Sequence, residues 1–120
     1  MTLFLAYQNR GITKTITVTD SSGNTIVPGV NDKVRAIIGH EGRLGTNNAD
    51  AKLVVESGTP TAAGSSFTKD TTNGVNTLRL DATDLAFDPG VYTLFIDLFD
   101  NADAAEYKNV DRQVFVLEPT

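Results

Sequence analysis

The sequence contains no cysteine, no tryptophan and only one histidine among its 120 residues. Without cysteine the chain has no disulfide, no thiolate nucleophile and no cysteine-based zinc site, so a catalytic or metal centre would have to use His40 and carboxylates. Basic residues are also scarce: 10 Lys and Arg stand against 15 Asp and Glu, a formal net charge of −5 at pH 7. The scarcity argues against a nucleic-acid partner, since phosphate binding needs a basic patch.

Long apolar runs are missing as well. The opening run Leu3-Phe4-Leu5-Ala6 is shorter than the apolar core of a signal peptide and has no basic residue before it. No segment approaches the roughly 20 apolar residues of a membrane helix. We therefore expect synthesis in the cytoplasm and no membrane partner. With 40% hydrophobic and 21% charged residues, the composition predicts one folded domain spanning residues 1–120.

Alternation of apolar and polar residues with a period of two, typical of half-buried strands, runs through most of the chain. It predicts strands at residues 12–19, 25–27, 33–39, 51–57, 75–80, 91–99 and 110–117. In the longest apolar strand the even-numbered residues 92, 94, 96 and 98 are all apolar, so that face should be core. Helical spacing occurs only at residues 81–87. The sequence thus predicts an all-β fold, an antiparallel two-sheet immunoglobulin-like β-sandwich with at most one short helical turn.

A structural motif occurs where the longest strand begins. In Asp88-Pro89-Gly90-Val91-Tyr92 a tyrosine lies two residues beyond a Pro-Gly turn. This is the arrangement of a tyrosine corner, in which the ring packs inward and the hydroxyl bonds a backbone group upstream. We expect Asp88, Gly90 and Tyr92 to serve folding rather than chemistry.

Sites for catalysis or metal binding find little support. His40 and Glu41 lie between two glycines in a loop over residues 40–50, without a nucleophile motif nearby, so a solvated loop histidine is expected. Two acidic groups could supply oxygens to Ca²⁺, although neither matches a calcium-loop motif. Helix capping, turns and a solvated hairpin tip explain them more simply, with Asp81 or Thr83 as the N-cap. The two groups are Asp81, Asp84 and Asp88, and Asp100, Asn101, Asp103 and Glu106.

Apolar residues at two places are candidates for a protein interface. If the even face of strand 91–99 is core, Phe95 and Phe99 point outward as an apolar patch, unless a bulge or a second layer buries them or the connection 58–66 folds across them. The amino terminus, residues 1–10, should form either an edge strand or an arm that inserts into a neighbour. Its apolar residues are Leu3, Phe4, Leu5 and Tyr7.

Short strands separated by turns make up residues 15–38 and residues 78–98, and these two passages resemble β-sandwich modules of tailed-bacteriophage virions. Residues 15–38 are similar to the opening of such modules, and residues 78–92, with Thr83-Asp84 in a helical turn before Pro89-Gly90-Val91-Tyr92, are similar to the amino-terminal domain of the phage baseplate upper protein. The resemblance implies a structural module that docks onto other virion proteins. The baseplate protein continues into a further domain, so a chain of 120 residues looks more like a capsid decoration, or cement, protein.

We therefore expect a non-enzymatic virion structural protein, without cofactor, that decorates the assembled head as a homo-oligomer or in many copies. A tail, neck or baseplate component is the first alternative. A carbohydrate-binding module is the second, because the loops of β-sandwiches often recognise sugars; with no tryptophan, only Tyr7 and Tyr107 would be available to stack on a sugar ring.

Overall fold

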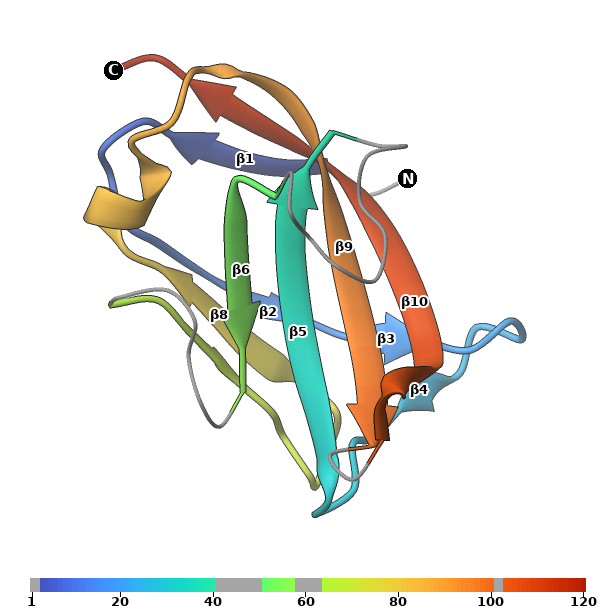
Figure 1. Cartoon of the computed structure of the whole chain (residues 1–120). Helices are drawn as coiled ribbons and strands as arrows, with labels where there is room; N and C mark the ends of the chain where they lie inside the picture. The colour runs from blue at the N-terminus through green and yellow to red at the C-terminus, as the bar shows by residue number, and fades with distance from the viewer. Residues whose placement is uncertain (1–2, 41–50, 58–63, 101–102) are drawn as a thin grey trace.

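The computed structural model describes residues 3–40, 51–57, 64–100 and 103–120, and for residues 100 and 103–110 it describes the backbone alone. Ten strands and one 3-10 helix occur in these residues (Figure 1). The elements are β1 (Leu3–Tyr7), β2 (Ile12–Ile16), β3 (Val18–Thr19), β4 (Thr25–Ile26), β5 (Asp32–Gly39), β6 (Leu53–Glu56), β7 (Ser66–Thr68), β8 (Asn76–Leu80), η1 (Ala82–Leu85), β9 (Gly90–Asp100) and β10 (Asp103–Glu118).

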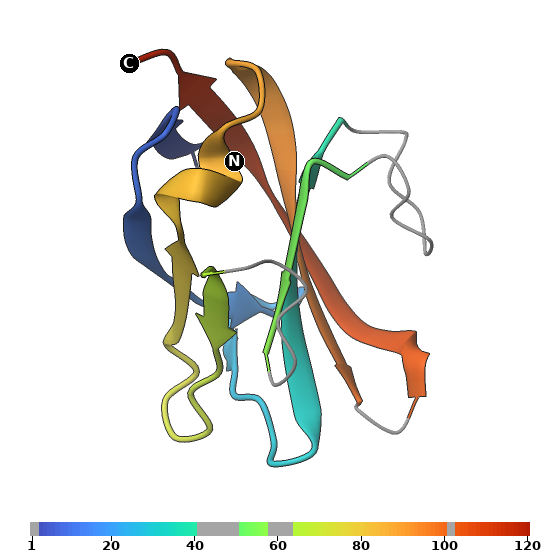
Figure 2. The same cartoon turned by 60° about the vertical axis from the view of Figure 1, so that its left-hand side comes forward.

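The strands form two main layers. One is a five-stranded sheet in the order β1-β10-β9-β5-β6, and the other is a three-stranded sheet in the order β2-β8-β7. Figure 2 shows β7 and β8 on one side of the molecule and β5, β6 and β9 on the other. A short β3-β4 ribbon completes the fold. The predicted all-β sandwich with a single short helical turn is confirmed, and its pairs are antiparallel except for β1, which runs parallel to β10.

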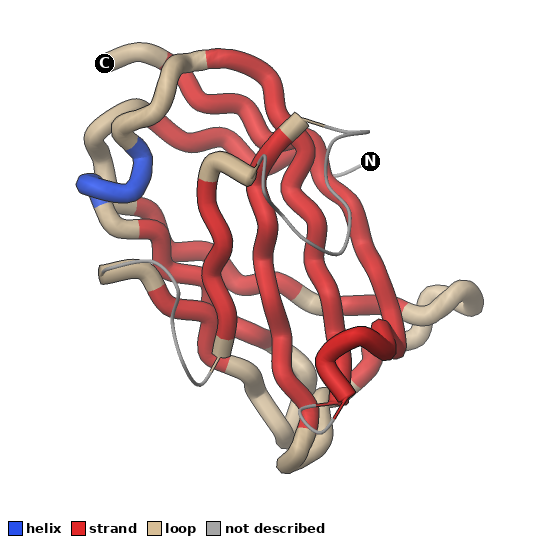
Figure 3. Tube along the Cα trace, in the orientation of Figure 1, coloured by secondary structure: helices blue, strands red, loops and turns tan. Residues whose placement is uncertain are grey.

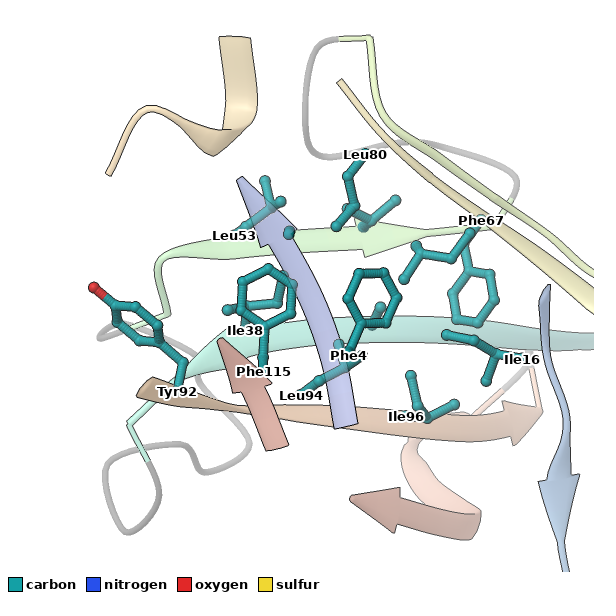
Figure 4. Close-up of a cluster of buried hydrophobic side chains, with 14 of the residues drawn as sticks. Phe4, Ile16, Ile38, Leu53, Phe67, Leu80, Tyr92, Leu94, Ile96 and Phe115 are labelled. Carbon is teal, nitrogen blue, oxygen red and sulfur yellow. The ribbon is translucent and has the colours of Figure 1, made fainter. Parts of the chain in front are cut away.

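The hydrophobic core lies between the two layers (Figure 4). Residues 92, 94, 96 and 98 of β9 belong to it, as the alternation predicts, and so do Leu78 and Leu80 of β8. β1 also contributes, because Phe4 is 1% exposed and stacks on Phe115 of β10 with 5.3 Å between ring centroids. Strand β1 is therefore part of the folded domain.

Three elements differ from the prediction (Figure 3). Residues 12–19 form two strands rather than one, because β2 pairs with β8 whereas β3 pairs with β4. Strand β7 lies where the end of a long connection was expected, and its Phe67 is 2% exposed. β10 begins at Asp103 instead of residue 110, with bulges between Asp103 and Asn109. In Figures 1 and 2 this first part of β10 curls away from the core side of the sheet.

Candidate functional site: an exposed apolar patch

The five-stranded sheet has an outer face, which points away from the core. Its composition follows from the register between strands. Phe4, Phe115 and Tyr92 form one row across β1, β10 and β9, and all three belong to the core. Because successive side chains alternate between faces, the neighbouring residues of each strand point outward.

At the β1 edge, this outer face is apolar. One row across β1, β10 and β9 consists of Leu5, Val116 and Val91, and Leu3 and Val114 lie side by side in an adjacent row. Directly opposed side chains on neighbouring strands lie about 4.5–5.5 Å apart, so these residues form one continuous surface. We call this surface the outer patch: Leu3, Leu5, Tyr7, Val91, Val114 and Val116.

Three residues of the outer patch are well exposed. Val91 is 66% exposed, Leu3 is 56% exposed and Tyr7 is 44% exposed, while the other three are half-buried. The one charged neighbour in its rows is Glu118, which pairs with Tyr7. A contiguous apolar surface of this kind typically marks a protein interaction site.

The amino-terminal residues were predicted as a candidate interface, and the structure separates them. Leu3, Leu5 and Tyr7 point outward, whereas Phe4 is buried in the core. Of the two forms expected for residues 1–10, residues 3–7 take that of an edge strand. Phe4 is consequently inaccessible to a partner of the folded domain.

The expectation that Phe95 and Phe99 form an exposed patch is wrong. Both lie outside the core cluster, on the outer face, but their exposed fractions are 8% and 2%. The guanidinium carbon of Arg112 lies 5.1 Å from the centroid of the Phe95 ring, and that of Arg35 lies 4.9 Å from the centroid of the Phe99 ring. Arginine side chains of the neighbouring strands β5 and β10 therefore pack over the two rings, on the same face of the sheet.

A buried ion pair lies between the two phenylalanines. Arg35 of β5 donates to Oδ2 of Asp97 from Nη2 at 3.0 Å and from Nε at 3.3 Å. The two side chains are 9% and 8% exposed. Burial raises the pKa of Asp97, and the hydrogen bond and charge of Arg35 only partly oppose this effect. The ion pair thus holds the Arg35 and Asp97 side chains in one arrangement, although removing their two charges from water costs free energy.

The tyrosine corner is confirmed. The Tyr92 hydroxyl donates to the Asp88 carbonyl at 2.6 Å across the Pro-Gly turn. Phe87 contacts the Tyr92 ring edge-on, with 5.1 Å between centroids. Burial, followed by the charge of Asp88, raises the pKa of Tyr92, so its hydroxyl keeps its proton and remains a donor. Gly90 lies beside the ring, where an added Cβ would make only ordinary contacts.

The single histidine takes part in the same aromatic group. His40 is exposed and its ring lies 4.8 Å from that of Tyr92, between centroids. Glu41 lies outside the described residues. In the described part of the chain, His40 thus makes a packing contact with a structural tyrosine.

The first acidic group predicted as a calcium alternative is engaged locally. Asp81 is the N-cap of η1 and accepts from the backbone N–H and hydroxyl of Thr83, which together lower its pKa. Asp84 accepts from the Ser65 hydroxyl at 2.5 Å. Within the described residues, no group of three or more His, Cys, Asp or Glu side chains could hold a metal ion. The side chains of the second group, residues 100–106, lie outside the described part.

Two clefts of about 400 Å³ lie at the seams between layers. In the first, the Lys69 ammonium donates to the carbonyls of Gly29, Val30 and Asp32, so this lysine ties two loops together. The second lies between β1, β2 and β10 and includes Lys14, whose Nζ is 4.6 Å from the centroid of the Phe4 ring. In each cleft a lysine ammonium is therefore already engaged, Lys69 by backbone carbonyls and Lys14 by an aromatic ring.

Sequence reasoning missed half of the outer patch: Val91, Val114 and Val116. Each lies on the face opposite to the predicted core, so the alternation signalled that they point outward. The sequence gives no signal for the parallel pairing that places β1 beside β10. That pairing brings residues 3–7 and 114–116 together.

Comparisons with known proteins find no matching family model and no curated relative. In the described part of the chain, no helix is long and apolar enough to span a membrane.

Proposed function

We propose that this chain is a non-enzymatic structural protein of a tailed-bacteriophage virion that docks on other virion proteins through the outer patch. Within that class, a capsid decoration protein, present in many copies on the assembled head, fits best. A tail, neck or baseplate component would use the same surface.

The outer patch is the observation that carries the proposal. Its six residues come from three neighbouring strands, and no charged residue separates them within their rows. Burying apolar surface stabilises association by about 25 cal/mol per Å² removed from water. A patch of six residues gives a modest interface by itself, but many copies on one shell would add avidity.

Two further features agree with a structural role. Residues 78–92, which resemble the phage module, form β8, η1 and the tyrosine corner in the order of that resemblance. The acidic side chains Asp81 and Asp84 serve as a cap and a hydroxyl partner. These are features of a stable scaffold, and the proposed mechanism is adhesion.

The proposal is tested by binding to assembled particles. Heads and tails of the phage that encodes the chain are prepared without it, incubated separately with the purified protein and sedimented. We expect saturable co-sedimentation with heads. Val91→Lys places a charge in the outer patch and should weaken the binding at least tenfold. The matched control is Val30→Lys, because Val30 is 85% exposed and lies in a loop outside the patch.

Each outcome of this experiment has a clear meaning. Equal loss of binding for the two variants would exclude the outer patch, and binding to tails alone would favour the tail alternative. A gene neighbourhood without virion genes would overturn the phage assignment. Saturable binding on a glycan array, abolished by Tyr7→Ala, would instead support a carbohydrate-binding module that stacks a sugar on this exposed ring.

A further inference from the structure

We propose that β1 is a self-association edge, at which two copies of this chain pair antiparallel through β1 and form a continuous ten-stranded sheet. The inference concerns the purified protein alone and does not depend on the proposed function. It rests on the free edge of β1, on the protection of the other edges and on the symmetry of the exposed residues of β1.

In the part of the chain that the structure describes, one edge of β1 has no strand partner, although the Tyr7 carbonyl at its end accepts from the Arg10 N–H at 3.1 Å. On its other side β1 pairs with β10. Gln8 donates its backbone N–H to the Glu118 carbonyl at 2.8 Å, on the β10 side. Because successive residues of a strand point their backbone groups to opposite sides, Leu3 and Leu5 direct theirs to the open edge.

The other edge strands carry features that prevent pairing. β6 ends at Glu56, which forms an ion pair with Lys33 at 3.4 Å. β2 carries Lys14, which points inward over Phe4. β7, β3 and β4 have only two or three residues each. Charges, inward-pointing lysines and short strands are the usual devices that block edge pairing. β1 has five uncharged residues, so among the described edges it is the least protected.

The sequence of β1 is suited to pairing with itself. Its exposed side chains are residues 3, 5 and 7, placed symmetrically about Leu5. In an antiparallel pair centred on Leu5, this residue faces Leu5 of the second copy, and Leu3 faces Tyr7. An interface with two-fold symmetry requires such self-complementarity. β1 has no charged residue, so like charges on the two β1 strands do not repel each other, although each copy has a net charge of −5.

The same register joins the outer patches of the two copies. Leu5, Val116 and Val91 form a row that ends at the open edge, and the two-fold axis continues it into the same three residues of the second copy. An apolar row of six residues then crosses the centre of the joined sheet. The paired segment is short compared with interfaces of 1,200–2,000 Å², so we expect reversible association at micromolar concentrations.

Sedimentation equilibrium of the purified protein tests the inference. The wild type should change from monomer to dimer as its concentration rises from about 1 µM to 1 mM, and a wild type that remains monomeric would overturn the proposal. Leu5→Pro removes a donor from the open edge and leaves the N–H groups that face β10, so it should weaken dimerisation at least tenfold. Val30→Lys, in a loop outside both β1 and the outer patch, is the control and should still dimerise.

A charge-swap experiment tests the register and does not depend on proline being tolerated. Leu5→Lys and Leu5→Glu should each be monomeric, because like charges face each other at the two-fold axis. Mixed in equal amounts, they should form a heterodimer. Failure of this mixture to associate would overturn the pairing centred on Leu5, whereas binding to phage heads by either variant would bear only on the proposed function.

Discussion

At the scale of single residues, the Tyr92 hydroxyl connects the start of β9 to the turn before it. Tyr92→Phe removes the donor of the 2.6 Å hydrogen bond and leaves the Asp88 carbonyl without it. Because a net hydrogen bond contributes about 0.5–1.5 kcal/mol, we expect the free energy of unfolding in urea to fall by about 1 kcal/mol. Tyr7→Phe is the matched control, since Tyr7 is exposed. An equal loss in both variants would argue against the corner.

The buried ion pair gives a second prediction for single residues. Arg35→Met leaves the Asp97 carboxylate buried without its counter-charge, which typically costs about 3–5 kcal/mol at neutral pH. The double variant Arg35→Met with Asp97→Leu removes both charges and should recover most of that loss. Urea unfolding of wild type, both single variants and the double variant gives the coupling between the two side chains. Additive losses would contradict the pairing.

The Arg35→Met variant should also have a characteristic pH dependence. The pKa of Asp97 is already raised in the folded protein, and losing the Arg35 charge raises it further. Between the ordinary pKa of an aspartate and this raised value, the folded state binds more protons than the unfolded state. Stability therefore falls as pH rises through that window and recovers as pH falls.

The measurement is the difference in free energy of unfolding between wild type and Arg35→Met at several pH values. We expect this difference to shrink as the pH falls from 7 toward 4. Asp70 and Asp81, whose pKa values are lowered by hydrogen bonds, act in the opposite direction but contribute equally to both proteins. A difference that does not vary with pH would mean that Asp97 is not buried in its charged form.

At the scale of elements, alternation predicted most strands because each has one face on the core. It assigned the inward faces of β8 and β9 correctly, and it placed Phe95 and Phe99 on the outer face. It could not predict that the two rings are buried, since the arginines that pack over them come from strands distant in sequence. For the same reason it joined β2 and β3, which are continuous in their alternation but pair with different partners.

β1 gives the prediction for an element. Phe4 is 1% exposed and stacks on Phe115, so Phe4→Ala should destabilise the domain by about 3–5 kcal/mol. Leu3→Ala, at a position that is 56% exposed, should change the free energy of unfolding by less than about 0.5 kcal/mol. Thermal and urea unfolding compare the two variants. Similar small effects of the two substitutions would mean that β1 detaches from the domain as a mobile arm. The burial of Phe4 argues against this alternative.

At the scale of the whole molecule, the fold could be predicted further than the candidate site. Composition and alternation are properties of the entire chain, and they were sufficient for the all-β sandwich. The outer patch combines residues from both ends of the chain, Leu3 with Val114 and Leu5 with Val116. Only the parallel pairing of the first and last strands brings them together. A site of this kind can therefore be identified once the strand pairing is known, and not from the sequence alone.

The uncharged character of the outer patch gives a prediction for the whole protein. The chain has a net charge of −5, but the side chains that docking through the patch would bury are apolar. The affinity of docking should therefore depend little on ionic strength. Burial of apolar surface should also give a negative heat-capacity change of binding. Titration calorimetry with phage heads at several temperatures, and at about 50 and 500 mM salt, measures both quantities. Affinity that falls tenfold or more with salt would indicate that acidic side chains meeting a basic shell surface hold the protein instead.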